Sequence, residues 1–388
     1  MARILTFTLP LAVTLFHAVS PIGLLANVLL ISFSALVLFA GFVLLGVGLL
    51  LPACASPFAV VLSLLLHVMS ASVSWAGKMP WGHCYVADLP RWFLWAWYPA
   101  LAITVLLPRK PVRRGVAAFL VVLSGAALLA AHQHAGVPRC TILAVGHGSC
   151  AVVESGDGRV FVIDGGSMGR ERQVSRVLSR FLWQAGYRTI DGIYLSHADV
   201  AHYNALAGLL RKFPARQLRT TAAVLASESP SLNALLDVCR SRGVDLVVAR
   251  DGAVQQAGSV SLTCLLPDAA AADDDDQRSL VVCVRGPQSS VLLPGDLEGR
   301  AAADVYRRAG QVDVLVSPHH GSPDANRHGI ADLTAPELVV VSARDSRHRR
   351  TLERVFAASR QVVLTAESGA VAVRLDRTRD WTTHMDCP

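Results

Sequence analysis

Only eight of the first 136 residues are Asp, Glu, Lys or Arg, and a segment so poor in charge does not fold as an ordinary soluble domain. A helix needs about 20 mostly apolar residues to cross the roughly 30 Å hydrocarbon core of a bilayer. The second of five apolar stretches is long enough to hold a re-entrant piece as well. The sequence therefore predicts about five membrane-spanning helices, within a range of about four to six. They lie at residues 4–20, 22–51, 57–77, 92–107 and 115–131.

The orientation of these helices follows from the loop RKPVRR at residues 109–114. Its four basic residues belong on the cytoplasmic side, because positively charged loops are retained there. Five spans then put the N-terminus inside, which agrees with Arg3, and the C-terminal domain outside. We expect a multi-pass protein of the cell (inner) membrane with an extracytoplasmic C-terminal domain.

The formal net charge of +7 is weak support for a nucleic-acid-binding surface. The first 136 residues hold seven basic residues and one acidic residue, so the rest of the chain nets only +1. Most of the excess is loop charge beside membrane helices. The eight cysteines include no C-x-x-C pair, which argues against a structural zinc finger.

From about residue 135 the pattern changes to short β-rich runs separated by turns and helical stretches. A Gly-Asp-Gly turn at residues 156–158 between two apolar runs predicts a β-hairpin. We therefore expect two domains: polytopic transmembrane helices over residues 1–134 and a mixed α/β domain over residues 135–388.

One loop of the second domain has the spacing of metal ligands. In the segment YLSHADVAHYNAL, residues 194–206, His197 and Asp199 lie on the loop after an apolar strand, and His202 opens the next helix. The residue just before that histidine is Ala201, which cannot supply a carboxylate. The loop alone therefore leaves open whether this is a metal site.

Other apolar strands also end in His or Asp. A single such residue is usually a turn or cap residue, but repetition at five strand ends predicts one site at a sheet edge. Imidazole and carboxylate groups suit zinc or manganese, and one or two such ions can activate water and hold a phosphoryl group. The further strand-end residues are Asp164, Asp296, His319 with His320, and Asp345 with His348.

Six segments of the second domain resemble the metallo-β-lactamase fold superfamily, and more closely the C-terminal domain of the ComEC family of DNA-uptake channel proteins. They are VGHGSCAVVES, VIDGG, YLSHADVAHYN, LPGDLE, SPHHGS and TAESGAVAVRL. Earlier in the chain, FHAVSPIGLLANVLLI is similar to part of the competence domain of that family. The resemblance implies a membrane α-helical segment followed by an αββα sandwich, with the site where the edges of the two sheets meet.

The same resemblance implies a function in DNA uptake. In that family the membrane part is thought to pass one DNA strand inward, while the outer domain is proposed to degrade the other as a metal-dependent nuclease. The expected partners are therefore single- or double-stranded DNA, the membrane, and other competence proteins or a chain that supplies missing spans.

By position, the resemblance also assigns roles to individual residues. Hydrolysis needs a proton acceptor, for which Asp199 and Asp296 are the candidates. Asp164 would orient the loop from behind the ligands, and His348 would complete the site. The expected ligands of one or two zinc or manganese ions are His197, Asp199, His202, Asp296, His319 and His320.

Substrate binding is assigned to Ser322, Arg344 and Arg347, since arginines beside the site would bind phosphates. A charged helix start exposed to solvent explains the arginines equally well. The acidic run at residues 273–276 is interpreted as a solvated loop rather than a cation site.

Three departures from the family pattern leave the enzymatic function open. Ala201 stands where the motif His-x-Asp-x-Asp-His has its second aspartate, and there is no histidine between His202 and His319. The chain also begins inside what resembles the competence domain. A truncated or degenerate paralogue, whose second domain is structural or guides DNA, is therefore an alternative to a nuclease. A membrane-anchored hydrolase of small molecules is a third hypothesis, which fits the fold but not the membrane sequence.

Overall fold

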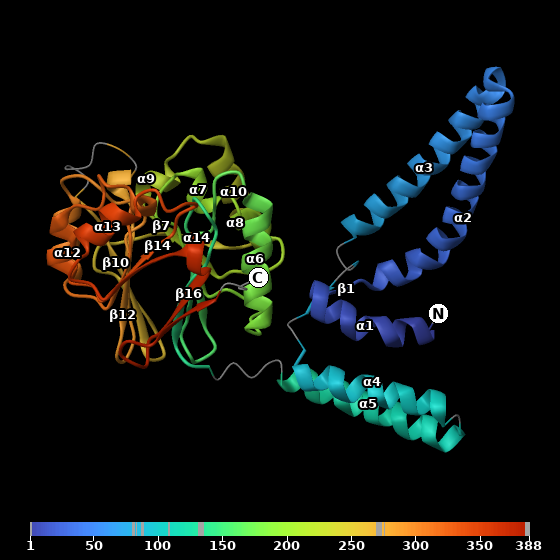
Figure 1. The fold of residues 1–388 in the computed structure, drawn as a ribbon, viewed down its shortest axis with the longest axis horizontal. Helices are drawn as coiled ribbons and strands as arrows, with labels where there is room; N and C mark the ends of the chain where they lie inside the picture. The colour runs from blue at the N-terminus through green and yellow to red at the C-terminus, as the bar shows by residue number, and fades with distance from the viewer. Residues whose placement is uncertain are drawn as a thin grey trace. The chain divides into compact units, whose positions relative to one another are not determined.

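A computed structural model describes most of the chain, which divides into two compact units, Met1–Ala127 and Leu128–Pro388 (Figure 1). The predicted domain boundary at residues 134 and 135 lies outside the described residues. The described residues are 2–79, 82, 84–86, 89–107, 109–130, 136–268, 274 and 276–384.

The apolar N-terminal stretches form helices, as the sequence predicts. Two helical stretches, 30–50 and 52–77, are long and apolar enough to cross a membrane by length and composition. The five-span topology and its orientation stay predictions. The helices are α1 (Ala2–Phe16), α2 (Pro21–Leu50), α3 (Ala55–Lys78), α4 (Arg91–Leu106) and α5 (Lys110–Ala130).

The start of α2 is fixed by local chemistry. The Ser20 hydroxyl accepts a hydrogen bond of 3.0 Å from the backbone N–H of Gly23. Pro21 occupies the first turn, where its missing N–H removes no helical hydrogen bond. The short strand β1 (Ala18–Val19) before this cap pairs antiparallel with β2 (Cys84–Tyr85). A 3₁₀ turn, η1 (Pro52–Cys54), joins α2 to α3.

The second unit contains two β-sheets. The first has the strand order β17-β16-β3-β4-β5-β6-β7-β8, and the second has the order β15-β14-β13-β12-β11-β10-β9. The first sheet comprises β3 (Arg139–Ile142), β4 (Ala151–Glu154), β5 (Val160–Ile163), β6 (Gly192–Tyr194), β7 (Gln217–Thr220), β8 (Asp245–Val248), β16 (Ala370–Arg374) and β17 (Trp381–His384). The second comprises β9 (Val254–Ala257), β10 (Val260–Leu265), β11 (Val281–Arg285), β12 (Ser290–Leu293), β13 (Val314–Val316), β14 (Leu338–Val341) and β15 (Gln361–Leu364).

Each sheet is antiparallel on one side and parallel on the other. Strands β5 to β8 pair in parallel in the first sheet, and β12 to β15 pair in parallel in the second. The carboxyl ends of parallel strands lie at one edge of a sheet, where loops collect side chains from distant parts of the sequence. This arrangement positions the site described below.

Helices cover the outer face of each sheet, so the unit is an αββα sandwich (Figure 1). The predicted fold class is confirmed. One set of helices comprises α6 (Glu171–Gln184), α7 (Val200–Tyr203), α8 (Leu206–Leu210), α9 (Ala222–Leu225) and α10 (Pro230–Ser241). The others are α11 (Ala302–Ala309), α12 (His328–Thr334), α13 (Arg349–Val355) and α14 (Thr365–Ser368).

Strand β14 shows why both faces of a sheet are apolar. Leu338 and Val340 pack into the core between the sheets, whereas Val339 and Val341 pack against the outer helices. Successive side chains of a strand point to opposite faces, so a strand buried on both sides needs a continuous apolar run. The run ELVVV in the sequence is therefore explained by the burial of β14 on both faces of its sheet.

Candidate metal centre

The candidate site lies where strands of both sheets end. In the first sheet, Asp164 directly follows β5, and His197 lies on the loop after β6. In the second sheet, Asp296 follows β12, and His319 and His320 follow β13. The structure thus brings together most of the strand-end residues that the sequence singles out.

The backbone at the site adopts unusual conformations. Asp164, His319 and His320 have positive φ angles of 55°, 48° and 52°. A left-handed conformation costs a non-glycine residue roughly 1–2 kcal/mol, and such residues gather at functional sites. The loops also pack closely, since a Cβ added at Gly166 would lie 2.5 Å from the carbonyl oxygen of Ala201. Glycine is therefore required at this contact.

We call His197, His202 and Asp296 the inner cluster. Their potential ligand atoms lie within 4.8 Å of one another, and no side chain of the three is more than 7% exposed. Nε2 of His202 lies 3.1 Å from Oδ1 of Asp296, without the geometry of a hydrogen bond. Nε2 of His197 lies 3.8 Å from Oδ2 of the same carboxylate and has no hydrogen-bond partner among the described residues.

The other ring nitrogen of each histidine is held by a hydrogen bond. Nδ1 of His202 donates to Oδ2 of Asp164 at 2.8 Å. Asp164 Oδ2 also accepts from the Ser196 hydroxyl at 3.0 Å, and that hydroxyl lies 2.9 Å from Nδ1 of His197. Both Nε2 atoms are thereby aimed at Asp296. A histidine that donates Nδ1–H to a fixed acceptor and presents Nε2 is a typical metal ligand.

His320 adds a third imidazole with the same arrangement. Its Nδ1 lies 3.2 Å from the carbonyl oxygen of Ser342, and its Nε2 lies 3.6 Å from Oδ2 of Asp296. On its other side, its ring centroid lies 4.5 Å from that of His147. Three imidazoles thus surround the Asp296 carboxylate.

The charges of the inner cluster depend on one another. Burial lowers the pKa of His197 to about 4, and burial likewise lowers the pKa of His320 to about 4. Burial also opposes protonation of His202, but the carboxylates of Asp164 and Asp296 outweigh it and raise its pKa to about 10. Burial acts to raise the pKa of Asp296, yet the facing histidines hold it well below its usual value. Without a metal, the inner cluster together with His320 therefore contains one imidazolium and two neutral imidazoles.

A second group, which we call the outer cluster, consists of Asp276, Glu298 and His319. Their potential ligand atoms also lie within 4.8 Å of one another, and each residue is partly exposed. Nδ1 of His319 lies 3.1 Å from Oε2 of Glu298. Oδ1 of Asp276 lies 3.5 Å from Nε2 of His197, so the two clusters adjoin. Burial and the charge of Asp296 raise the pKa of Asp276 to about 6.

The ligand loop itself departs from the prediction at Asp199. This residue is the N-cap of α7, and its Oδ1 accepts a hydrogen bond of 2.6 Å from the backbone N–H of Ala201. Its side chain belongs to neither cluster of the described residues. Ala201 is buried and only 3% exposed. Of the five residues from 197 to 201, the loop therefore gives the inner cluster only His197.

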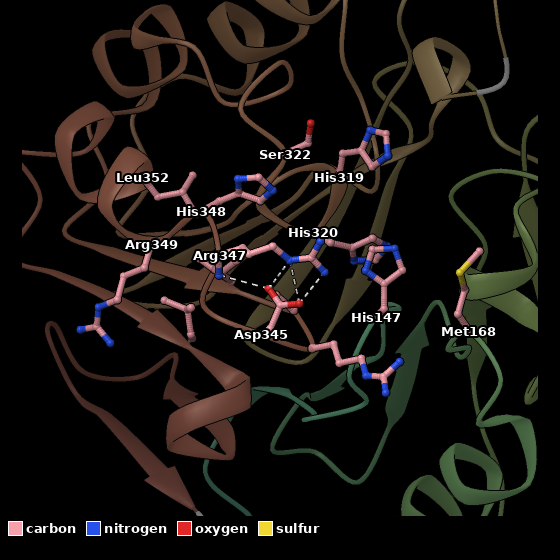
Figure 2. A pocket seen from close by; sticks show the side chains of 14 residues that line it. His147, Met168, His319, His320, Ser322, Asp345, Arg347, His348, Arg349 and Leu352 are labelled. Atoms are coloured by element: carbon pink, nitrogen blue, oxygen red, sulfur yellow. Dashed lines mark hydrogen bonds and ion pairs between the residues drawn. The ribbon is translucent and has the colours of Figure 1, made fainter.

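The residues predicted to bind substrate line a cleft of about 370 Å³ beside the site. Ser322, Arg344, Arg347 and His348 all line it, so His348 lies in the cleft and not in the inner cluster. Figure 2 shows His147, His319 and His320 at the same cleft, with Arg347 paired to Asp345.

The arginines of this cleft differ in their partners. Arg347 forms a 2.7 Å ion pair with Asp345, and Arg349 is paired with Glu353 and Glu367. Arg344 makes no hydrogen bond or ion pair with any residue that the structure describes. It is therefore the arginine most available to a phosphate.

Sequence reasoning missed three residues of the site. Asp276 lies in the acidic run interpreted above as a solvated loop; its side chain is 34% exposed, but its Oδ1 also lies 3.5 Å from Nε2 of His197. Glu298 follows Asp296 by two positions in PGDLE, and His147 lies in the GHGS turn. Two signals were available in the sequence: Glu298 is an acidic residue two positions from a predicted ligand, and His147 is a histidine in a glycine turn after a strand.

The donor set of the inner cluster fits a divalent metal ion. Nε2 of His197 is buried without a hydrogen-bond partner among the described residues, and an unpaired buried nitrogen is costly unless something binds it. Next to it lies a cavity of about 10 Å³, lined by Asp164, Ser196 and Asp296 among others. That volume suits one water molecule or ion.

Comparisons with known protein families agree with this architecture. Residues 2–111 match the family model described as Competence protein, and residues 143–230 match that of the metallo-beta-lactamase superfamily. The chain joins a competence-protein segment to a metallo-β-lactamase-fold domain. The resemblance predicted from the sequence motifs is confirmed.

Two curated proteins are similar to this chain. ComE operon protein 3 of Bacillus subtilis (strain 168) is 26% identical over 235 residues, which cover 56% of this chain and 30% of that protein. Recombination protein 2 of Haemophilus influenzae is 25% identical over 244 residues, which cover 61% of this chain and 29% of that protein. The matched part therefore spans less than a third of either relative.

Solved structures include similar folds. YhfI from Bacillus subtilis, a metallo-beta-lactamase fold protein, is 13% identical with a TM-score of 0.42, covering 58% of this chain and 95% of YhfI. Zinc-bound PqqB from Methylobacterium extorquens is 15% identical with a TM-score of 0.42, covering 58% of this chain and 97% of PqqB.

Proposed function

We propose that this chain acts in DNA uptake at the cell membrane, and that its C-terminal domain hydrolyses DNA phosphodiester bonds with a bound divalent metal ion. The match to a competence-protein family supports the first part. The arrangement of imidazoles around Asp296 supports the second. The orientation expected from the basic loop at residues 109–114 would place the domain on the extracytoplasmic side of a multi-pass protein.

One observation carries the enzymatic proposal. His197, His202 and His320 each anchor Nδ1 on a neighbouring group and direct Nε2 at Asp296. Three fixed imidazoles and a carboxylate form a donor set for zinc or manganese. A stabilising role alone does not require three imidazole Nε2 atoms to face one carboxylate in the interior.

The residues of the chain would divide the chemistry among them. A divalent metal bound by the inner cluster and His320 would supply Lewis acidity, which activates water and offsets charge on the phosphoryl group. Asp296 suits the role of ligand, because its lowered pKa keeps it ionised and makes it a poor proton acceptor. Asp199 remains the candidate proton acceptor, with one carboxylate oxygen engaged by the α7 cap.

The cleft beside the site would bind the DNA backbone. The Arg344 guanidinium has no partner among the described residues, and His348 and Ser322 offer further polar groups to a phosphate. Such contacts orient a phosphodiester without reading its sequence. We expect single- or double-stranded DNA as substrate, and other competence proteins or a chain supplying further spans as partners.

A non-catalytic domain is the second candidate function, and the ligand loop favours it. Ala201 offers no ligand atom, and Asp199 uses an oxygen to cap α7 instead of joining either cluster. In that case the cleft would guide DNA through its basic side chains, and the domain would not cleave it.

The two functions are separated by purifying the full chain in detergent and measuring bound zinc and manganese together with cleavage of single- and double-stranded DNA. We expect bound metal and cleavage, and loss of both in His202→Asn. His384→Asn, which changes an exposed histidine of β17, is the matched control and should keep both. A wild-type chain that binds DNA, but does not bind metal and does not cleave DNA, would establish the non-catalytic function.

A further inference from the structure

The outer cluster has a composition unlike that of the inner cluster. Asp276 begins the 3₁₀ turn η3 (Asp276–Arg278), whereas Glu298 and His319 come from the loops after β12 and β13. Their ligand atoms meet within 4.8 Å. Two carboxylates directed at one point repel each other unless positive charge, from His319 or from a bound cation, lies between them.

A buried atom of the inner cluster also faces this place. Nε2 of His197 is only slightly accessible, has no hydrogen-bond partner among the described residues, and lies 3.5 Å from Oδ1 of Asp276. The same atom lies 3.8 Å from Oδ2 of Asp296. It is therefore aimed between the two clusters, where neither carboxylate satisfies it.

We propose that Asp276, Glu298 and His319 form a second divalent-cation site, in which Asp276 supplies the carboxylate that Ala201 cannot. The carboxylate comes from a loop that precedes β11, not from the His-x-Asp loop that precedes α7. All three ligands of this second site come from loops of the second sheet, and the site lies next to the first.

The donor set determines the class of cation. Two carboxylates and one imidazole favour manganese over zinc, because hard oxygen ligands suit Mn²⁺. The side chains of Asp276, Glu298 and His319 are 34%, 25% and 34% exposed, which leaves coordination positions for water or a phosphate oxygen. The cation held there is weakly bound and exchangeable compared with one in the buried inner cluster.

The role of the two adjoining cations in DNA cleavage rests on the proposed function; the existence of the second cation site does not. Adjoining cations can hold the attacking and leaving oxygens of a phosphoryl transfer on opposite sides. A one-ion site cannot do this. The outer cluster thus explains how a chain with alanine at position 201 would keep two-metal chemistry.

The test is a titration of the full chain in detergent with Mn²⁺ alone, followed by equilibrium dialysis and elemental analysis. We expect about two ions per wild-type chain and about one in Asp276→Asn, with spin coupling between neighbouring Mn²⁺ ions in the wild-type paramagnetic resonance spectrum only. Asp274→Asn is the matched control, since it removes the same charge from the same loop and should keep both ions. The Asp274 carboxylate accepts a hydrogen bond from the Gln277 N–H, which an asparagine oxygen can also accept.

The outcomes separate this inference from the proposed function. One bound ion in the wild type, unchanged in Asp276→Asn, overturns the second site even if DNA is cleaved. Equal loss in Asp276→Asn and Asp274→Asn overturns it too, because the loop charge alone would then explain binding. Two ions with a selective loss in Asp276→Asn support the site even if no DNA is cleaved, in which case only the nuclease proposal fails.

Discussion

The two clusters share an edge of the sandwich but differ in how their side chains are held. The inner cluster is buried, and each of its histidines is fixed by a hydrogen bond through Nδ1. The outer cluster is partly exposed, and the one hydrogen bond between its members joins His319 to Glu298. Ligands held rigidly before metal arrives bind it more tightly than ligands that must be ordered. If both clusters bind metal as proposed, we expect the inner cluster to hold its ion more tightly and the outer cluster to exchange its ion more readily.

The largest effect is expected from Asp296→Asn, because that carboxylate faces all three imidazoles. We expect metal affinity to fall by more than about 100-fold, which exceeds the usual effect of removing a residue that only hydrogen-bonds to a metal ligand. Both ions should be lost. Elemental analysis after dialysis measures this. Asp313→Asn is a control, since Asp313 accepts hydrogen bonds from Ser290 far from the clusters. A variant that retains both ions would show that Asp296 is not a ligand.

Asp164→Asn should have the next largest effect. Asparagine keeps the shape of the side chain but not the charge that orients and polarises His202. We expect metal affinity to fall about 10- to 100-fold. Competition with a metal-binding dye gives the affinity. Because Asp164 contacts His202 of the inner cluster, we expect the affinity for the first ion bound to fall. A fall in affinity confined to the second ion would contradict this expectation.

Metal binding should release a proton from the inner cluster. The pKa of His202 is raised to about 10, so at neutral pH this imidazole is protonated, and its proton must leave before a metal binds. His197 and His320, whose pKa values are lowered to about 4, are already neutral and release none. We therefore expect about one proton released near pH 7.5 and an affinity that rises toward pH 10.

Calorimetry in two buffers with different ionisation enthalpies measures that proton. The raised pKa of His202 also affects the stability of the metal-free protein. The protonated imidazole stabilises the folded state fully below pH 6.5, the pKa of histidine in the unfolded chain, and this stabilisation is lost as the pH rises through about 10. The metal-free melting temperature should fall over that range. No proton release, together with a flat melting temperature, would show that His202 is neutral.

The smallest effect is expected in the cleft, outside both clusters. Arg344→Ala should weaken DNA binding and reduce the slope of log affinity against log salt by about 1, as expected for one lost phosphate contact. Arg347→Ala should change the slope less, because the Arg347 guanidinium is already paired with Asp345. Metal content should stay the same in both. Binding measured by fluorescence anisotropy at several salt concentrations distinguishes them, and equal slopes would remove the special role of Arg344.

Much of the fold could be predicted from the sequence because its signals are local. Apolar stretches of suitable length predict helices, and continuous apolar runs such as ELVVV predict strands buried on both faces. The strand-end positions of Asp164, Asp296 and His320 follow from the same runs. Their convergence could be expected because parallel strands deliver their carboxyl ends to one edge.

The sequence by itself determined that this chain has an apolar helical segment and a mixed α/β domain with His and Asp at its strand ends, since hydrophobic periodicity and strand length are properties of neighbouring residues; the sandwich was implied by the family resemblance. Only the tertiary structure decided which of these side chains meet. Asp199, three residues from His202, turns to cap α7, because a free backbone N–H lies within its reach. Asp276, on a distant loop, reaches His197 because the two sheets pack face to face. A carboxylate from a distant loop therefore lies beside a histidine of the ligand loop, and proximity along the chain cannot reveal that.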